Sequence, residues 1–203
     1  VPAIEIAPPE SYEPLDRALR NLSQYQWLIA TSANAVAALR ARMDALGLSA
    51  KACGHLRIAA IGSATAQALL ALGLPPALTP PEYVAESLVE AIGDRTRGRH
   101  VLLVRAAVAR DVIPDALRAQ GTRVDVVDAY RTVIPADSVQ AIRTVFANGR
   151  SPDAATFTSS STVANFLALL HEAGVAAPAS LRAISIGPVT SRTRRARPLR
   201  RSV

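Results

Sequence analysis

Two short stretches place hydroxyl and amide side chains directly after an apolar run and just before a helix-like pattern. The first is Thr31-Ser32-Ala33-Asn34, which follows Trp27–Ala30, and the second is Ser159-Ser160-Ser161-Thr162, which follows Ala154–Thr158. Side-chain oxygens at such turns accept hydrogen bonds from the unpaired amides of a first helical turn. The same amides and the positive helix end also bind anions. Ordinary helix capping and anion binding therefore both stay open.

A second landmark follows each of these stretches at nearly equal spacing. Ile61-Gly62-Ser63-Ala64-Thr65 lies 31 positions after Thr31 (counted to Gly62), and Ile186-Gly187-Pro188-Val189-Thr190 lies 29 positions after Thr158 (counted to Gly187). Two units that share two landmarks indicate a duplicated domain. Four such turns favour anion binding over capping alone. The candidate anion-binding residues are Thr31, Ser32, Asn34, Ser63, Thr65, Ser159, Ser160 and Thr190.

Three further side chains are candidates. Arg105 and Arg110 flank the turn after the apolar run His100–Val104, where they either pair with ligand carboxylates or lie solvated at a sheet edge. Tyr130 ends the last apolar run of the first half. A tyrosine there either packs with a hydrated tip or presents its hydroxyl to a cleft.

Other common chemistries lack a signal in this sequence. There is no glycine-rich dinucleotide fingerprint, no phosphate-binding loop and no nucleophile elbow. His55, His100 and His171 are scattered, and Cys53 is the single cysteine. The sequence therefore predicts neither a metal site nor a cofactor, and it predicts no disulfide framework, which favours a cytoplasmic location.

Apolar runs and amphipathic patterns alternate strictly along the chain. Strands are expected at residues 27–30, 56–61, 77–79, 100–104 and 124–129, with helices at 34–45, 64–72, 83–92 and 112–120 between them. Near-continuous apolar strands indicate a parallel sheet covered by helices on both faces, so the fold class is α/β, flavodoxin-like or Rossmann-like. Residues 8–128 are expected to form one complete five-stranded domain.

The second half has fewer elements. Helices are expected at residues 136–147 and 163–173 and strands at 154–158 and 181–186, which makes residues 136–193 a partial second domain. The first residue is not methionine and an arginine-rich stretch follows Thr193, so we expect a chain shortened at both ends.

A strongly positive net charge is one signal of a nucleic-acid partner. The value is +7 over 203 residues, but six arginines lie within residues 192–203, and without them it falls to +1. A basic tail at residues 194–203, expected to be disordered, explains the excess better than a basic face. Nucleic acid is therefore an improbable partner, and no apolar run is long enough to span a membrane.

In the order and spacing of these stretches, the chain resembles the uroporphyrinogen-III synthase family. The matching stretches are Trp27–Val36, Ile58–Leu69, Tyr83–Leu88, Val101–Arg110, Gly121–Thr132, Thr156–Phe166 and Ala183–Thr193. The resemblance implies two α/β domains joined by a two-stranded linker, here residues 1–7 and 129–135. It implies a monomeric lyase without metal or cofactor that closes hydroxymethylbilane, inverts its last ring and releases water.

The resemblance also assigns roles to the candidate residues. Tyr130 would assist loss of the terminal hydroxyl of the substrate. The hydroxyl turns would hold some of its eight carboxylates. Two rival functions remain: a non-catalytic anion-binding module derived from this enzyme, and a nucleic-acid-binding protein that uses the basic tail.

Overall fold

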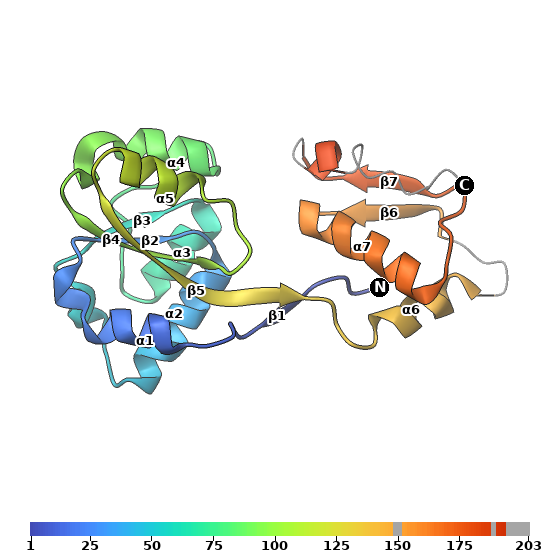
Figure 1. Cartoon of the computed structure of the whole chain (residues 1–203), viewed down its shortest axis with the longest axis horizontal. Helices are drawn as coiled ribbons and strands as arrows, with labels where there is room; N and C mark the ends of the chain where they lie inside the picture. The colour runs from blue at the N-terminus through green and yellow to red at the C-terminus, as the bar shows by residue number, and fades with distance from the viewer. Residues whose placement is uncertain (148–151, 188–189, 194–203) are drawn as a thin grey trace. The chain divides into compact units, whose positions relative to one another are not determined.

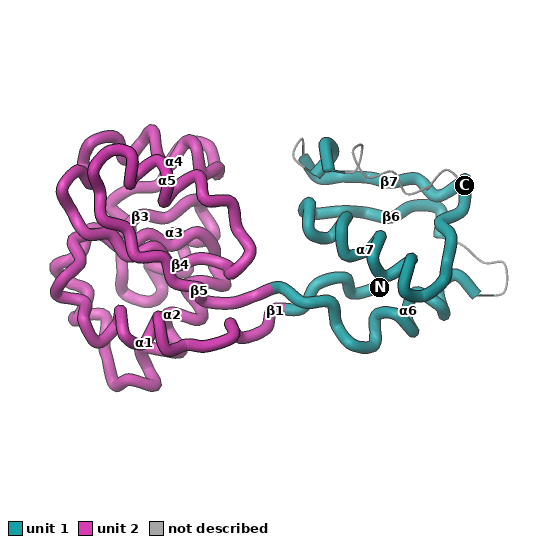
Figure 2. Tube along the Cα trace, in the orientation of Figure 1, with its two compact units in different colours: residues 1–5, 132–203 teal, residues 6–131 magenta. Residues whose placement is uncertain are grey.

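The computed structural model describes residues 1–147, 152–187 and 190–193, and the arginine-rich stretch 194–203 lies outside them. The chain forms two compact units. Unit 2 is the continuous segment Ile6–Arg131, and unit 1 combines Val1–Glu5 with residues from Thr132 onward (Figure 2). These boundaries lie at residues 6 and 131, so unit 2 includes a few more residues than the predicted segment 8–128.

Unit 2 is organised around a five-stranded sheet in the order β1-β5-β4-β2-β3. Its strands are β1 (Glu5–Ala7), β2 (Trp27–Ala30), β3 (Arg57–Ala60), β4 (His100–Ala106) and β5 (Arg123–Val133). The pairs β2–β3, β2–β4 and β4–β5 are parallel. All four residues of β2 are buried, as expected for a central strand with helices on both faces. The predicted α/β class with a mostly parallel sheet is confirmed.

Helices cover both faces of this sheet (Figure 1). Their bounds are α1 (Glu13–Arg20), α2 (Ala33–Ala45), α3 (Ser63–Ala71), α4 (Ala85–Ile92) and α5 (Val112–Ala119), with short 3₁₀ turns at Leu22–Gln24, Ala50–Cys53 and Gly93–Thr96. Helices α1, α2 and α3 pack on one face against Leu28 and Leu102. Helices α4 and α5 pack on the other against Ile29 and Leu103. Alternate side chains of each strand therefore pack into two separate hydrophobic cores, one on each face of the sheet.

A β-bulge interrupts the pairing of β4 with β5. Arg105 pairs with Asp128, whereas the next residue, Ala106, pairs with Tyr130. Ala129 is the extra residue, and both Ala129 and Tyr130 pack on the core that contains α1, α2 and α3. A bulge re-aims the side chains that follow it. Here it puts two successive residues of β5 on the same face.

Unit 1 is smaller. It contains α6 (Ser138–Val145), β6 (Ala154–Phe157), α7 (Ser160–Ala173) and β7 (Arg182–Ser185), and β6 and β7 pair in parallel. Its core includes Ile142, Phe157, Val163 and Leu169, with Ala3 packed against it. The prediction that this half is an incomplete domain stays a prediction.

The first residues of the chain are also tied to unit 1 by hydrogen bonds. Ser138 Oγ donates to the carbonyl oxygen of Pro2 at 2.7 Å, and Asn165 Nδ2 donates to that of Ala3 at 2.8 Å. Because β1 begins at Glu5 and β5 runs on to Val133, both crossings between the units occur within strands of the same sheet.

Two predicted elements differ from the structure. Residues 77–79 do not form a strand: the pairing there is a single parallel bridge between Ala59 and Leu78. Prolines at positions 75, 76, 80 and 81 flank this segment and lack the amide hydrogen that a longer ladder requires. The helix predicted at residues 83–92 begins at Ala85, which leaves Tyr83 outside it. Within the described residues, no helix is long and apolar enough to cross a membrane.

Candidate active site

Ser32 and Tyr130 meet at the carboxyl edge of the unit 2 sheet. Ser32 has an extended backbone and is the N-cap of α2, where its Oγ accepts a hydrogen bond from the amide of Ala35 at 3.1 Å. The same Oγ donates to the phenol oxygen of Tyr130 at 3.1 Å. The predicted capping role of Ser32 is confirmed. The bulge makes the contact with Tyr130 possible, because it turns Tyr130 toward the face that carries α2.

The direction of this hydrogen bond has a chemical consequence. Ser32 Oγ already accepts from the Ala35 amide and uses its own proton to donate to Tyr130. The phenol oxygen is therefore the acceptor, and the phenol proton of the half-buried Tyr130 is left for another partner. This arrangement suits a neutral hydrogen-bond donor aimed at a polar ligand.

A small pocket opens on the other face of the same sheet edge, beside α4 and α5. It has a volume of about 210 Å³ and includes Thr31, Ile61, Tyr83, Arg105 and Ile113 in its lining. Thr31 directly precedes Ser32, so one residue of this turn lines the pocket and the next contacts Tyr130 on the opposite face of the sheet. The pocket combines an apolar lining with a guanidinium group.

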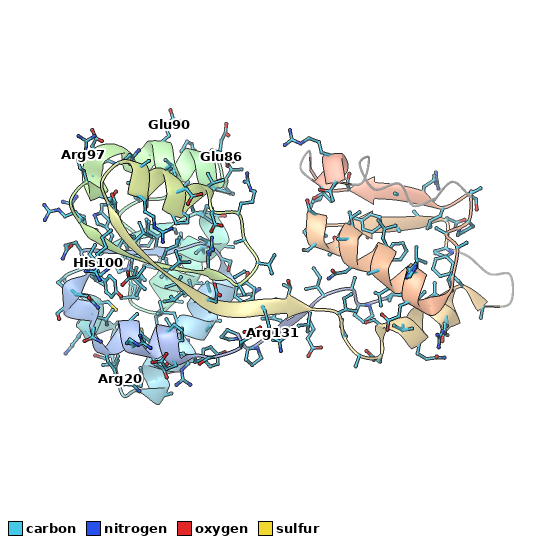
Figure 3. The ribbon with its side chains drawn as sticks, viewed as in Figure 1. Arg20, Glu86, Glu90, Arg97, His100 and Arg131 are labelled. Atoms are coloured by element: carbon cyan, nitrogen blue, oxygen red, sulfur yellow. The ribbon has the colours of Figure 1, made fainter. Side chains whose placement is uncertain are left out.

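The two predicted arginines differ in environment. The side chain of Arg105 is 12% exposed, and its Nη2 lies 2.8 Å from Asp111 Oδ1. Arg110 is largely exposed and donates from its two terminal nitrogens, Nη1 and Nη2, to Glu86, which projects from α4 (Figure 3). The hydrogen bond from Arg110 lowers the pKa of Glu86. Both arginines line the pocket, and Arg105 has the less exposed side chain of the two.

The remaining candidates of unit 2 do not cap a helix. The N-cap of α3 is Gly62, which has no side chain, and Ser63 is the exposed first residue of the helix. Of the two alternatives for this turn, side-chain capping is therefore absent, and anion binding by Ser63 stays a prediction. Thr65 is buried and Asn34 is exposed in the first turn of α2.

In unit 1, the hydroxyls gather at the carboxyl ends of β6 and β7. Ser159 is the N-cap of α7 and forms a capping box with Thr162: each side chain accepts from the amide of the other residue. Ser160 Oγ accepts a hydrogen bond from Thr193 Oγ1 at 2.8 Å. Thr190 is buried. The structure thus assembles Ser159 and Ser160 within one hydroxyl cluster.

A second polar cluster was not predicted from the sequence. Tyr25 donates a hydrogen bond to Asp125 at 2.7 Å, and His100 Nε2 lies 2.9 Å from the same carboxylate oxygen, outside good hydrogen-bond geometry. Burial, then the hydrogen bond to Asp125, raises the pKa of Tyr25. His100 begins β4, so this cluster lies at the amino edge of the sheet, away from Tyr130. No described group of histidine, cysteine, aspartate and glutamate side chains could hold a metal ion.

A parallel α/β unit with hydroxyls, a phenol and a partly buried arginine at the carboxyl edge of its sheet is typical of proteins that bind small anionic molecules there. The family model described as uroporphyrinogen-III synthase HemD matches residues 1–203. The chain therefore belongs to the uroporphyrinogen-III synthase family, which acts in tetrapyrrole biosynthesis, and the resemblance inferred from the sequence is confirmed.

Individual relatives agree with this assignment. The chain is 39% identical over 204 residues to uroporphyrinogen-III synthase of Synechococcus elongatus, covering 95% of this chain and 74% of that one. It is 31% identical to the porphyrin biosynthesis protein HemD of Ruminiclostridium josui, covering 94% of this chain and 37% of that protein. A mutant uroporphyrinogen III synthase from Thermus thermophilus has the same fold, with a TM-score of 0.68 at 21% identity, over 95% of this chain and 77% of that one.

Proposed function

We propose that this protein closes linear hydroxymethylbilane to uroporphyrinogen III, inverting the last ring and releasing water. Membership of the family supports the reaction. The hydrogen bond from Ser32 to Tyr130 is the single observation that supports a specific catalytic residue, because it leaves the phenol proton of the half-buried Tyr130 free at the carboxyl edge of the sheet.

Tyr130 acts on the leaving group in this proposal. Its phenol donates to the terminal hydroxyl of the substrate as the carbon–oxygen bond breaks, and the hydroxyl departs as water. The closing macrocycle loses a proton in a later step, which restores the phenol and balances the reaction. A neutral phenol suits this role, because it places no further negative charge beside a substrate with eight carboxylates.

The hydroxyl turns bind those carboxylates. In unit 2, Thr31, Ser32 and Asn34 surround the first turn of α2, and Ser63 and Thr65 lie in the first turn of α3. In unit 1, Ser159, Ser160 and Thr190 provide a comparable set. Helix amino ends stabilise negative charge near them. Binding at several such points also holds the flexible chain in the folded geometry that ring closure needs.

The same proposal covers the setting in which the enzyme works. We place it in the cytoplasm as a monomeric lyase that requires no metal or cofactor. Its single cysteine, Cys53, is buried and free, as is common in reducing compartments.

The decisive experiment measures which product isomer forms. Hydroxymethylbilane is added to the protein, the product is oxidised, and the porphyrin isomers are separated and detected by fluorescence. The type III isomer supports the proposal, and Tyr130→Phe should then lower turnover by roughly 10²–10⁴, as for a positioned acid. Exclusive formation of the spontaneous type I isomer would instead favour a non-catalytic binding module. Type III formation at full rate by the Tyr130→Phe variant would remove the assignment to Tyr130.

A further inference from the structure

The pocket on the α4 and α5 face has a fixed aromatic wall. Tyr83 is 61% exposed although it lines this pocket. It packs so closely on Gly62 that a side chain at that position would come within 3.1 Å of the Tyr83 ring. Glycine at position 62 thus allows the tyrosine to lie against the turn between β3 and α3. An exposed ring held by the backbone beneath it offers a flat surface to a ligand.

Arg105 is the less exposed of the two arginines that line the same pocket. Its guanidinium is oriented by Asp111 at 2.8 Å, and Nη1 makes only a long contact of 3.3 Å with the carbonyl oxygen of Arg110. Its Nε is buried and has no hydrogen-bond acceptor among the described residues. A buried donor atom without an acceptor is unfavourable, so this guanidinium has unused capacity for hydrogen bonds. Asp111 is 60% exposed and already shows the position that one carboxylate takes on this group.

We propose that this pocket binds one pyrrole ring of the substrate, with the ring against Tyr83 and a side-chain carboxylate on Arg105. The inference rests on the proposed function, since that function supplies the pyrrole substrate. Pockets that enclose a whole drug-sized ligand hold about 300–1,000 Å³. At about 210 Å³, this pocket suits one ring of a larger molecule.

The ring bound here is a different ring from the one that reacts. Thr31 faces this pocket, whereas Ser32 contacts Tyr130 on the opposite face of the sheet. The two places are nevertheless connected, because the amide of Ala107 donates to the carbonyl oxygen of Tyr130 at 2.8 Å. Ala107 begins the loop that carries Asp111. The pocket therefore anchors the substrate across the same sheet edge from the reacting end.

Binding of a fragment tests the pocket without turnover. The probe is a monopyrrole with one propionate side chain, titrated into the full chain and followed by the NMR shifts of the pyrrole ring protons, with its neutral amide as comparison. We expect the amide and the Arg105→Gln variant to bind about 10- to 100-fold more weakly, as for loss of a hydrogen bond between charged groups. Tyr83→Ala should weaken binding about 2- to 10-fold, and Tyr83→Phe should not.

Matched variants control for charge and folding. Arg123→Gln removes one positive charge at the exposed amino end of β5, away from the pocket, and should leave binding unchanged. If Arg105→Gln fails to fold, Arg105→Lys keeps the positive charge but removes the guanidinium group. The Tyr83 variants test the same pocket independently, because Tyr83 is exposed and its replacement should not affect folding. Equal binding of the acid and its amide, no binding at any attainable concentration, or normal binding by Tyr83→Ala would overturn the proposal.

Turnover separates this inference from the proposed function. If both hold, Tyr83→Ala raises KM for hydroxymethylbilane and leaves kcat nearly unchanged, because a remote ring is held equally in ground and transition states. Type III formation with unchanged KM in Tyr83→Ala refutes the pocket and keeps the function. Specific monopyrrole binding without type III formation keeps the pocket and refutes the function.

Discussion

Ser32→Ala tests whether the N-cap of α2 also positions Tyr130. Loss of the cap should lower the free energy of unfolding by about 1 kcal/mol, and thus Tm by about 2–4 °C. Loss of the hydrogen bond to the phenol, worth about 1 kcal/mol, should lower kcat by about fivefold. Unfolding is followed by circular dichroism and turnover by porphyrin fluorescence.

A double-mutant cycle shows whether Ser32 acts through Tyr130. In the Tyr130→Phe background there is no phenol to orient, so Ser32→Ala should no longer lower turnover, although it still lowers stability. If the two changes instead multiply in their effects on kcat, Ser32 has an independent role and the positioning argument fails.

Ser32→Asp separates the two roles of this residue. Aspartate caps helices as well as serine does, so stability should stay close to that of the parent. An ionised carboxylate can only accept hydrogen bonds. It should therefore accept the hydrogen bond of the Tyr130 phenol, which is then no longer available to the leaving hydroxyl of the substrate. We expect turnover to fall well below that of Ser32→Ala. Equal or higher turnover would show that the direction of the hydrogen bond is irrelevant.

Two further predictions concern stability and reactivity. The bidentate hydrogen bond from Arg42 lowers the pKa of Asp16, so this pair stabilises the fold above the ordinary carboxyl pKa of about 4 and ceases to do so as the pH falls through the lowered value. The difference in free energy of unfolding between the parent and Asp16→Asn, from urea titrations, should therefore shrink below about pH 4; a constant difference would contradict the assignment. Burial raises the pKa of the Cys53 thiol, so iodoacetamide should label it at pH 8 only after the addition of urea, and rapid labelling of the folded protein would contradict its burial.

The fold class could be predicted because the sequence signals for it are local. Buried strands such as Trp27–Ala30 read as continuous apolar runs, and the Ser32 cap stands directly before its helix. The family followed from several weak motifs in a fixed order. Capping at Ser159 was predictable for the same reason.

The geometry of the site was not predictable, because it depends on contacts distant in sequence. The hydrogen bond between Ser32 and Tyr130 joins residues 98 positions apart. It also depends on a β-bulge at Ala129, where the sequence has no glycine as a signal. The sequence pattern predicts Tyr83 as the first residue of a helix, but the helix begins at Ala85. Tyr83 instead packs on Gly62, a contact that the local pattern does not predict. The pairing of Arg110 with Glu86 likewise arises from the approach of α4 to the loop before α5.

The discontinuity of unit 1 affects how the protein is made. During synthesis, Ile6–Arg131 emerges as one continuous segment that contains β2, β3 and β4 and most of β1 and β5, so it can fold while the ribosome is still translating. Pro2 and Ala3 are translated before this segment, yet their hydrogen-bonding partners Ser138 and Asn165 are translated only after it. Pro2 and Ala3 must therefore wait without these partners while the whole of unit 2 is translated. A pause in translation after residue 131 would prolong the time in which Pro2 and Ala3 are accessible to chaperones and proteases.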